Sequence, residues 1–343
     1  SGGVDCAVPA GSTSPGNTHA ARTAYYEVNR SAEMARAHLP GNPWLGQQLT
    51  AVVNIPDFGF PEFNCNAFWD ETTINFFTSG TAGAGLSCTN TGELAGVISH
   101  EWGHGLDDND VIPTISNPGE GIADVYAALR LGESCIGRGF FTGVNTCGDD
   151  DPCTECDGVR DIDWAKRTSG EAHDLAWIDD HCPAPFLGTP GPCGGGIHCE
   201  GAVYSEAIWD LVHRDLPALY GYDTNTALEV VTRLVFLGAG GVGNWYSCAA
   251  DGTGTGDGCN ADSGYRNLLA IDDDDGDPSN GTPHMTAIHA AFDRHGIACD
   301  APPVQDSGCV GGPSAAPTLQ ATPVDRGASL SWSAVAGAER YRI

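Results

Sequence analysis

The sequence predicts an α+β protein that is rich in disulfides. Segments of β-branched and aromatic residues occupy positions 49–55 and 66–77, whereas helical periodicity and helix caps recur at 90–132 and again at 202–296. The chain also contains 14 Cys, an even number that is typical of a disulfide framework. We therefore expect an N-terminal lobe built on a mixed sheet and a mainly helical C-terminal lobe.

The first predicted helix covers residues 18–38. Thr18 can cap its N-terminus, and apolar side chains recur behind it near helical spacing. The segment LTAVVNI at 49–55 then predicts a strand. The segment NAFWDETTINFF at 66–77 predicts one or two strands, because it combines aromatic and β-branched residues.

Two well-delimited helices follow the predicted strands. The first begins near Asn90, which can act as its cap, with Glu93 in the capping-box position. The second has Asn117 as its cap, Pro118 in its first turn and Gly132 at its end. These two helices carry the polar residues on which the functional prediction depends.

The rest of the chain combines an irregular region with further helices. Residues 133–200 are rich in Cys, Asp, Gly and Pro, so we expect mostly loops that are held by disulfides. Helices are expected at 202–216, 225–238 and 282–296, the last with Thr282 as its cap.

The predicted organisation has four parts. Residues 1–110 form the N-terminal lobe, residues 111–300 the helical lobe and residues 301–316 a linker. Residues 317–343 alternate like two strands around Trp332, which we expect to be buried, and they resemble the start of a fibronectin type III domain. We expect this segment to be incomplete, because two strands cannot close a sandwich by themselves.

The charge balance excludes several classes of partner. The 45 Asp and Glu outweigh the 15 Lys and Arg and give a net charge of −30, and such a surface repels nucleic acid and anionic membranes. No stretch approaches the ~20 apolar residues of a membrane helix. Because no basic and apolar leader is found at the start, Ser1 is expected to be a mature N-terminus. With its many cysteines, the chain is predicted to be secreted and extracellular.

Three cysteines lie close together in the irregular region, namely Cys147, Cys153 and Cys156. Such a group can hold a structural zinc ion. Because no second pair stands at zinc-finger spacing, the sequence favours disulfides over zinc here. The sequence does not determine which cysteines pair.

The strongest chemical signal is the segment ISHEWGHGL at 98–106. On a helix, His100 and His104 lie about 40° apart on one face, and apolar side chains occupy the opposite face. Glu101 falls at the edge of the histidine face, where it can reach a water molecule at a bound metal without being a ligand. The pattern is typical of a zinc hydrolase, although three fixed positions can also match by chance.

The residues after the second histidine complete a possible zinc site. Hydrolytic zinc usually takes three protein ligands and leaves one position for water. Glu120, in the first turn of the next predicted helix, can join His100 and His104 as the third ligand. Asp124 lies one turn later and can accept a hydrogen bond from a ligand imidazole. Alternatively, Glu120 only caps its own helix, but the combined pattern favours one bound Zn²⁺ ion.

These motifs resemble those of the thermolysin-like and fungalysin-like metallopeptidases, the gluzincins. The segments that carry the resemblance, in the family's order, are NTHAARTAYYEVNRS, NAFWD, HEWGH, GEGIAD and GGGIHCEGAVYSEAIWDL, and they cover about residue 15 to about residue 300. The resemblance implies a two-lobed, thermolysin-like α+β fold and the activity of a zinc-dependent endopeptidase.

The resemblance also implies a role for each matching residue at the metal. His100, His104 and Glu120 would bind zinc. Glu101 would be the general base that takes a proton from water, and Asp124 would orient a ligand histidine.

Four further residues would contact the substrate. In the family, a histidine like His198 stabilises the tetrahedral oxyanion. The backbone at Asn66 and Ala67 would pair with an extended substrate by strand addition. Arg160, in the segment DGVRDIDW, resembles an arginine that holds a substrate carbonyl group.

Two supports of the oxyanion site differ from the family pattern. Cys193 stands where the family has an Asp before the oxyanion histidine, so Glu200 or an unrelated carboxylate is the alternative partner of His198. Val111 occupies the place of a Tyr that often assists at the oxyanion. One such donor typically contributes ~3 kcal/mol to the transition state, so the differences predict weaker stabilisation.

Acidic loops offer oxygen ligands for Ca²⁺. In the segment 271–284 the candidate ligands are Asp272, Asp273, Asp274, Asp275 and Asp277. The segment does not fit the EF-hand register, because Ile271 stands at the first ligand position, so calcium and a solvated turn stay open as alternatives. The same alternatives apply to the acidic segments 107–110 and 148–158.

The sequence as a whole predicts a secreted zinc endopeptidase that acts on protein or peptide substrates. One alternative is a catalytically weak or inactive peptidase-like protein with an adhesive or matrix role, and the intact His100, Glu101, His104 and Glu120 oppose it. A second alternative is a zinc hydrolase with a different substrate, and the NAFWD strand, which suits an extended backbone, opposes that one. The sequence does not indicate the oligomeric state.

Overall fold

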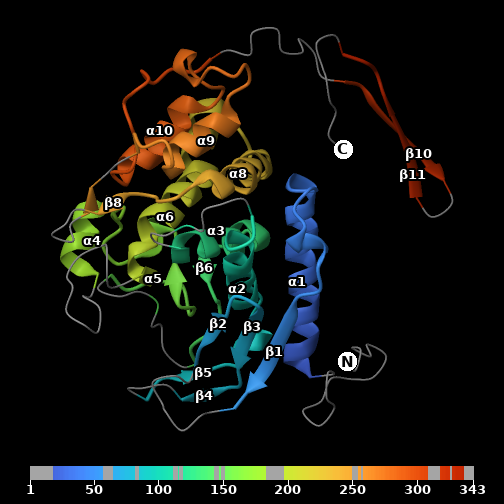
Figure 1. The fold of residues 1–343 in the computed structure, drawn as a ribbon, viewed down its shortest axis with the longest axis vertical. Coiled ribbons are helices and arrows are strands. Elements are labelled where there is room, and N and C mark those ends of the chain that lie inside the picture. Colours follow the sequence, from blue (N-terminus) through green and yellow to red (C-terminus); the bar gives the residue numbers. More distant parts are fainter. Residues whose placement is uncertain are drawn as a thin grey trace.

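The computed structural model places helices and several small sheets in a mixed α/β arrangement (Figure 1). It describes residues 18–56, 65–81, 85–110, 115, 119–142, 147, 151–182, 197–248, 254–255, 258–307, 317–324 and 327–335. The chain begins this described part with helix α1 (His19–His38), and the Thr18 hydroxyl accepts a hydrogen bond from the Ala21 amide as the N-cap. The first predicted helix is therefore confirmed.

The largest sheet has three strands and lies beside α1 (Figure 1). Its strands are β1 (Thr50–Ile55), β2 (Ala67–Trp69) and β3 (Thr73–Phe77), in the order β1-β3-β2. Strand β3 runs parallel to β1 and antiparallel to β2, so the sheet is mixed. The segment 66–77 thus forms two strands, and β2 lies at an edge of the sheet, where a further strand can pair.

Helices α2 (Ala95–Asp107) and α3 (Gly119–Leu131) pack closely together. A Cβ atom at Gly103 would lie 3.0 Å from the Ala123 Cα atom, so this close approach requires a glycine. Gly132 ends α3 with a φ of 68°, which glycine adopts without steric strain. The helix-helix contact fixes the side chains of α3 relative to those of α2.

The start of α2 differs from the sequence prediction. Asn90 caps a short 3-10 helix, Thr91–Glu93, by accepting a hydrogen bond from the Gly92 amide. Helix α2 begins one turn later, and its N-cap residue, Leu94, makes no side-chain capping bond. The predicted cap Asn117 and Pro118 of the following helix lie outside the described residues.

The chain from residue 175 to residue 294 is mainly helical among its described residues. Its helices are α4 (Leu175–His181), α5 (Ile197–Glu200), α6 (Ala202–Asp210), a π-helical turn (Leu211–Asp215), α7 (Leu216–Tyr220), α8 (Thr224–Gly238), α9 (Gly264–Asp272) and α10 (Met285–Arg294). Apolar residues of α2, α3, α6, α8, α9 and α10 form one large buried core. Helix α9 was not predicted. The predicted cap Thr282 is also wrong, since His284 precedes α10 and the Thr282 hydroxyl instead donates to Asp272.

Disulfides join the irregular segments, as the cysteine content predicts. The pairs among the described residues are Cys65–Cys88, Cys135–Cys156, Cys147–Cys153, Cys182–Cys199 and Cys259–Cys299. The small sheets near them are β4 (Gly80–Thr81) with β5 (Ser87–Cys88), β6 (Cys135–Ile136) with β7 (Arg160–Asp161), and β8 (Ser247–Cys248) with β9 (Gly254–Thr255). Because the three clustered cysteines are all in disulfides, their alternative role as zinc ligands is not supported.

The last described segment is a hairpin of β10 (Leu319–Val324) and β11 (Gly327–Trp332). Its two strands confirm the predicted alternation. The expected burial of Trp332 is wrong, because 38% of the residue is exposed: a two-stranded hairpin has no second sheet to cover its apolar face. Among the described helices, none combines the length and the apolar character needed to cross a membrane.

Candidate active site

Helix α2 presents two histidines on one face. His100 and His104 are one turn apart, and their Nε2 atoms lie 3.1 Å from each other. On the opposite face, Ile98, Trp102 and Leu106 are almost fully buried. The apolar face therefore anchors the helix in the core, and the Nε2 atoms of the two imidazole rings converge on the other side.

The Glu120 carboxylate meets these rings from the first turn of α3. Its Oε2 atom lies 3.0 Å from His100 Nε2 and 3.5 Å from His104 Nε2, yet this buried oxygen has no partner with hydrogen-bond geometry among the described residues. Tetrahedral zinc with bonds of ~2.0 Å places its ligand atoms ~3.3 Å apart. The spacing and the His-His-Glu donor set therefore fit one zinc ion.

Asp124 fixes the orientation of one imidazole. His100 donates from Nδ1 to Asp124 Oδ1 at 2.7 Å, which leaves the Nε2 lone pair directed at the other possible ligands. Burial by itself would lower the pKa of His100. The charge and hydrogen bond of Asp124, together with the nearby Glu120, outweigh burial and raise this pKa to about 10. A metal bound at His100 Nε2 would therefore displace a proton from that nitrogen.

Arg160 holds Asp124 from the other side. Its Nε and Nη2 atoms donate to the two carboxylate oxygens at 2.7 Å each. Burial raises the pKa of Asp124, but the charges of Arg160 and His100 outweigh burial and keep that pKa well below its usual range. The predicted contact of Arg160 with a substrate carbonyl stays a prediction. Its pairing with Asp124 was not predicted from the sequence.

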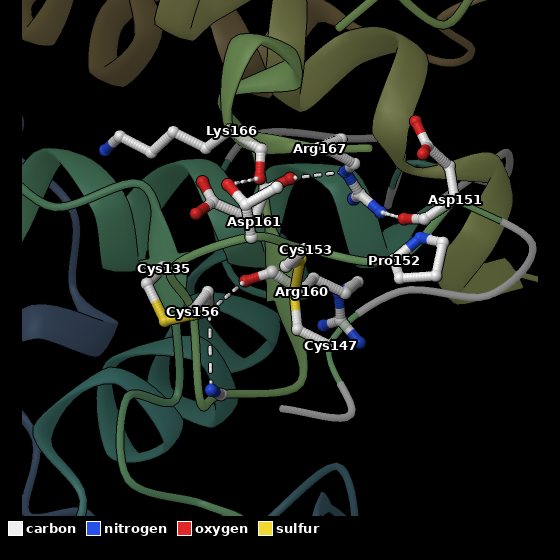
Figure 2. Close-up of a disulfide and its surroundings, with 12 residues drawn as sticks. Cys135, Cys147, Asp151, Pro152, Cys153, Cys156, Arg160, Asp161, Lys166 and Arg167 are labelled. Carbon is white, nitrogen blue, oxygen red and sulfur yellow. Dashed lines mark hydrogen bonds between the residues drawn. A yellow bond between two sulfur atoms is a disulfide. The ribbon is translucent and has the colours of Figure 1, made fainter. Parts of the chain in front are cut away.

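Two disulfides fix the segment that carries Arg160. Figure 2 shows Cys135–Cys156 and Cys147–Cys153 close to this residue. The backbone of β7 also pairs with β6, where Ile136 faces Arg160. These constraints compensate for the lack of regular structure in the region and hold the guanidinium group in place.

Glu101 lies on α2, next to His100, and is almost fully buried. Desolvation raises its pKa, although the neighbouring His100 and His104 act in the opposite direction. A carboxylate with a raised pKa is suited to taking up a proton and releasing it again near neutral pH.

The short helix α5 contributes the third histidine of the site, His198. His198 Nε2 lies 3.3 Å from Glu120 Oε2. Although 57% of the side chain is exposed, desolvation and then the positive charge of Arg160 lower the pKa of His198. A neutral imidazole still carries one N–H donor.

Two glycines allow His198 to approach Glu120. A Cβ atom at Gly201 would lie 2.9 Å from the Gly121 backbone nitrogen, and one at Gly121 would lie 3.0 Å from the Gly201 oxygen. The disulfide Cys182–Cys199 also joins the residue after His198 to the end of α4. The contact between the two glycines therefore places the first turn of α3 against the residue after α5, and the disulfide ties α5 to α4.

The alternative partner of His198 is placed elsewhere. Glu200 is buried near Tyr246. Desolvation is the main cause of the raised pKa of Tyr246, and the negative charge and hydrogen bond of Glu200 raise it further. Cys193 and Val111, which replace the family's Asp and Tyr, lie outside the described residues.

The edge strand β2 borders the site. Ala67 pairs with Phe76 on β3, and the Asn66 carbonyl accepts hydrogen bonds from the Phe77 amide and the Thr91 hydroxyl. The Trp69 indole donates to Asp108, just after α2, at 2.5 Å. This link between the strand and the histidine helix was also missed, because nothing local in the sequence signals it.

The acidic loop after α9 only partly resembles a cation site. Carboxylate oxygens of Asp273, Asp274 and Asp275 lie within 4.8 Å of one another. Asp272 instead accepts hydrogen bonds from Thr282 and His284. Asp277 caps a 3-10 helix through the Ser279 amide. These two residues have structural partners, and calcium at the loop stays a prediction.

Comparisons with known proteins support the fold. No family model matches the chain, and no curated protein sequence matches it. Among solved structures, the chain is similar to a precursor of protealysin, a metalloproteinase from Serratia proteamaculans, with a TM-score of 0.50 and 15% sequence identity. The match covers 84% of this chain and 80% of that one. At this identity the likeness shows a metalloproteinase-like fold and not a shared activity.

Proposed function

We propose that the protein is an extracellular zinc-dependent endopeptidase. The observation that carries this proposal is the convergence of His100 Nε2, His104 Nε2 and Glu120 Oε2 within 3.0 to 3.5 Å of one another. The fold likeness to a metalloproteinase supports it, and the disulfides favour an oxidising, extracellular location. The resemblance of the motifs to the gluzincins agrees with the same assignment.

In this proposal the protein's own groups move the protons. His100, His104 and Glu120 hold Zn²⁺, which when bound supplies Lewis-acid chemistry by lowering the pKa of water and polarising a carbonyl group. Glu101 takes a proton from the attacking water and passes it to the leaving amine. His198 donates its N–H to the oxygen of the scissile carbonyl as negative charge develops there.

Substrate binding uses the free edge of the three-stranded sheet. An extended peptide adds to β2 by backbone hydrogen bonds at Ala67, next to Asn66, whose carbonyl is already used within the protein. The hydrogen bond from Trp69 to Asp108 holds this strand next to α2, the helix that carries His100 and His104. A peptide backbone is therefore the substrate class that the site fits best.

The test combines a metal analysis with a peptidase assay. We expect one zinc per chain and hydrolysis of casein that stops with phenanthroline and returns with added zinc. Glu101→Gln should keep the zinc and lower the rate by at least ~100-fold, because it removes the general base. Hydrolysis by this variant at the wild-type rate would contradict the mechanism. Bound zinc without hydrolysis in the wild type would instead favour the inactive peptidase-like alternative.

A further inference from the structure

A basic pocket lies at the end of α3 that is farthest from Glu120. Its volume is about 540 Å³, and its wall contains the cationic side chains of Arg138, Lys166 and Arg214. Glu120 and Gly132 are at opposite ends of α3, which has 13 residues, and this helix is therefore ~19 Å long. A molecule in the pocket would not touch the proposed reacting groups.

The charge of this pocket is opposite to that of the chain. Three of the 15 Lys and Arg residues line it, against two acidic residues, Glu133 and Asp163, in a chain with 45 Asp and Glu. A random share of charged groups would make its wall strongly negative. The positive charge of this pocket is therefore unusual for this chain, and it suits a negatively charged ligand.

The cations differ in how far the protein already satisfies them. Arg214 donates to Asp210 at 2.7 Å and to Asp163 at 2.5 Å, so its role is structural. Arg138, which is half exposed, donates its Nε atom to Glu133 at 3.1 Å, and its Nη1 atom lies 3.8 Å from Asp157 Oδ1. Among the described residues, no hydrogen bond from its two Nη atoms is found, so these atoms can donate to a ligand.

Lys166 is held in place and keeps donors for a ligand. Its ammonium group donates to the Ser134 hydroxyl at 3.0 Å and lies 3.7 Å from Asp163. Its carbonyl accepts hydrogen bonds from the Thr154 amide and hydroxyl at 2.8 and 2.9 Å. Figure 2 shows the Lys166 side chain extending away from Arg167 and Asp151 in the disulfide-bonded segment.

The aromatic wall of the pocket adds a further unsatisfied donor. Trp209 is 5% exposed, and its indole N–H has no hydrogen-bond partner among the described residues. Its ring stacks on His213 at a centroid distance of 3.9 Å. Buried N–H groups without a partner are uncommon in native proteins, but this one is enclosed, so the donors that a ligand in the pocket can reach are those of Arg138 and Lys166.

We infer that this pocket binds a small oxyanion, either an inorganic ion such as sulfate or phosphate or the carboxylate of an amino acid. Arg138 supplies a planar pair of donors, which suits carboxylate and phosphate oxygens, and Lys166 supplies a second positive charge. The inference does not depend on the proposed peptidase activity, since neither residue lies at the metal site.

The experiment measures anion binding to the whole chain by calorimetry and by thermal melting at constant ionic strength set with sodium chloride. Sulfate and phosphate test the inorganic source, and N-acetylglutamate tests the carboxylate source. We expect at least one of them to bind at one saturable site and raise the melting temperature. The anion that binds identifies the source, and absence of binding by all three would overturn the inference.

Matched variants test the location of the site. Arg138→Gln and Lys166→Gln should each weaken binding about ten-fold, as expected for a lost charge-assisted hydrogen bond. Arg30→Gln removes an exposed arginine on α1 and should leave binding unchanged. Equal binding by all three variants would place the anion elsewhere and refute the assignment. Glu101→Gln should bind the anion like the wild type, which separates this result from failure of the peptidase proposal.

Discussion

Arg160 and Asp124 form a bidentate pair, with both guanidinium-carboxylate hydrogen bonds at 2.7 Å. Asp124 in turn accepts the Nδ1 proton of His100 at 2.7 Å. The three residues come from β7, α3 and α2, so the pair ties a disulfide-bonded segment to the two helices of the proposed metal site. The orientation of one imidazole therefore depends on a residue far away in the sequence.

Weakening this pair should reduce metal affinity. We expect Arg160→Lys to lower zinc affinity by about 10-fold and Asp124→Asn by up to about 100-fold, because groups that orient a ligand histidine typically contribute on this scale. Lysine keeps the charge but cannot form two parallel hydrogen bonds. Competition with a chromogenic chelator measures the affinities. Arg138→Gln is the control, and a similar loss in that variant would show that the effect is not specific to the pair.

The residues around Glu120 Oε2 should separate into two classes. Glu120→Gln should lose most of the bound zinc, because it replaces an anionic ligand by a neutral one. His198→Ala should keep the zinc and lower kcat by about 100- to 1,000-fold, the usual effect of removing one oxyanion donor. Metal content and peptide hydrolysis are measured on the same preparations. Loss of zinc from His198→Ala would show that this histidine, 3.3 Å from Glu120, is a ligand instead.

The disulfide Cys182–Cys199 should matter for turnover as well as stability. It bonds the residue next to His198 to the end of α4, so replacing both cysteines by serine should release α5. We expect a loss of about 2–4 kcal/mol of stability together with a fall in kcat. The matched control removes Cys259–Cys299, which joins the segment before α9 to the segment after α10. That variant should lose stability but retain kcat, and an equal fall in kcat would assign the effect to general destabilisation.

Local signals in the sequence predict part of this structure well. Thr18 marks the start of α1, and the spacing of His100 and His104 places both on one face of α2. The His-Glu contact also follows, because Glu120 is in the first turn of α3 and the two helices are adjacent in sequence. Such features depend on helical periodicity and capping, which act over only a few residues.

Features that depend on distant partners could not be predicted. The pairing of β1 with β3, the partner of Arg160 and the bond between Trp69 and Asp108 all join residues far apart in the sequence. Trp332 was expected to be buried because its segment alternates like a strand, but alternation does not reveal whether a second sheet covers it. Tertiary packing decides these cases, and no local pattern encodes it.

A buried ion pair between α1 and α3 should contribute more than an exposed one. Arg130 Nη2 lies 2.7 Å from Glu27 Oε2, and both side chains are largely buried. Glu27→Gln leaves the arginine without its counter-charge, so we expect a loss of about 2–4 kcal/mol in the free energy of unfolding. Glu33→Gln, which removes the exposed partner of Arg30, should cost less than about 1 kcal/mol. Urea denaturation measures both values, and equal losses would contradict the prediction.

The buried carboxylate of Asp107, at the end of α2, should make stability depend on pH. Asp107 is 4% exposed, and desolvation, followed by the negative charge of Asp110, raises its pKa to about 7, despite a hydrogen bond from the Ile115 amide. Between pH 4 and 7 the unfolded chain has lost this proton while the folded protein still holds it. The contribution of Asp107 to stability therefore falls as the pH rises through this window and stays low above it.

Replacing this carboxylate by a neutral amide removes the cost of ionising it. At pH 8 we expect Asp107→Asn to be more stable than the wild type by about 2–4 kcal/mol, and at pH 4 the two should be nearly equal, since each pKa unit corresponds to about 1.4 kcal/mol. Asparagine can still accept the hydrogen bond from Ile115. Asp274→Asn, at an exposed position, is the control and should shift stability little at either pH. A difference between Asp107→Asn and the wild type that does not change with pH would mean that Asp107 is already ionised at low pH in the folded protein, with a cation compensating its charge.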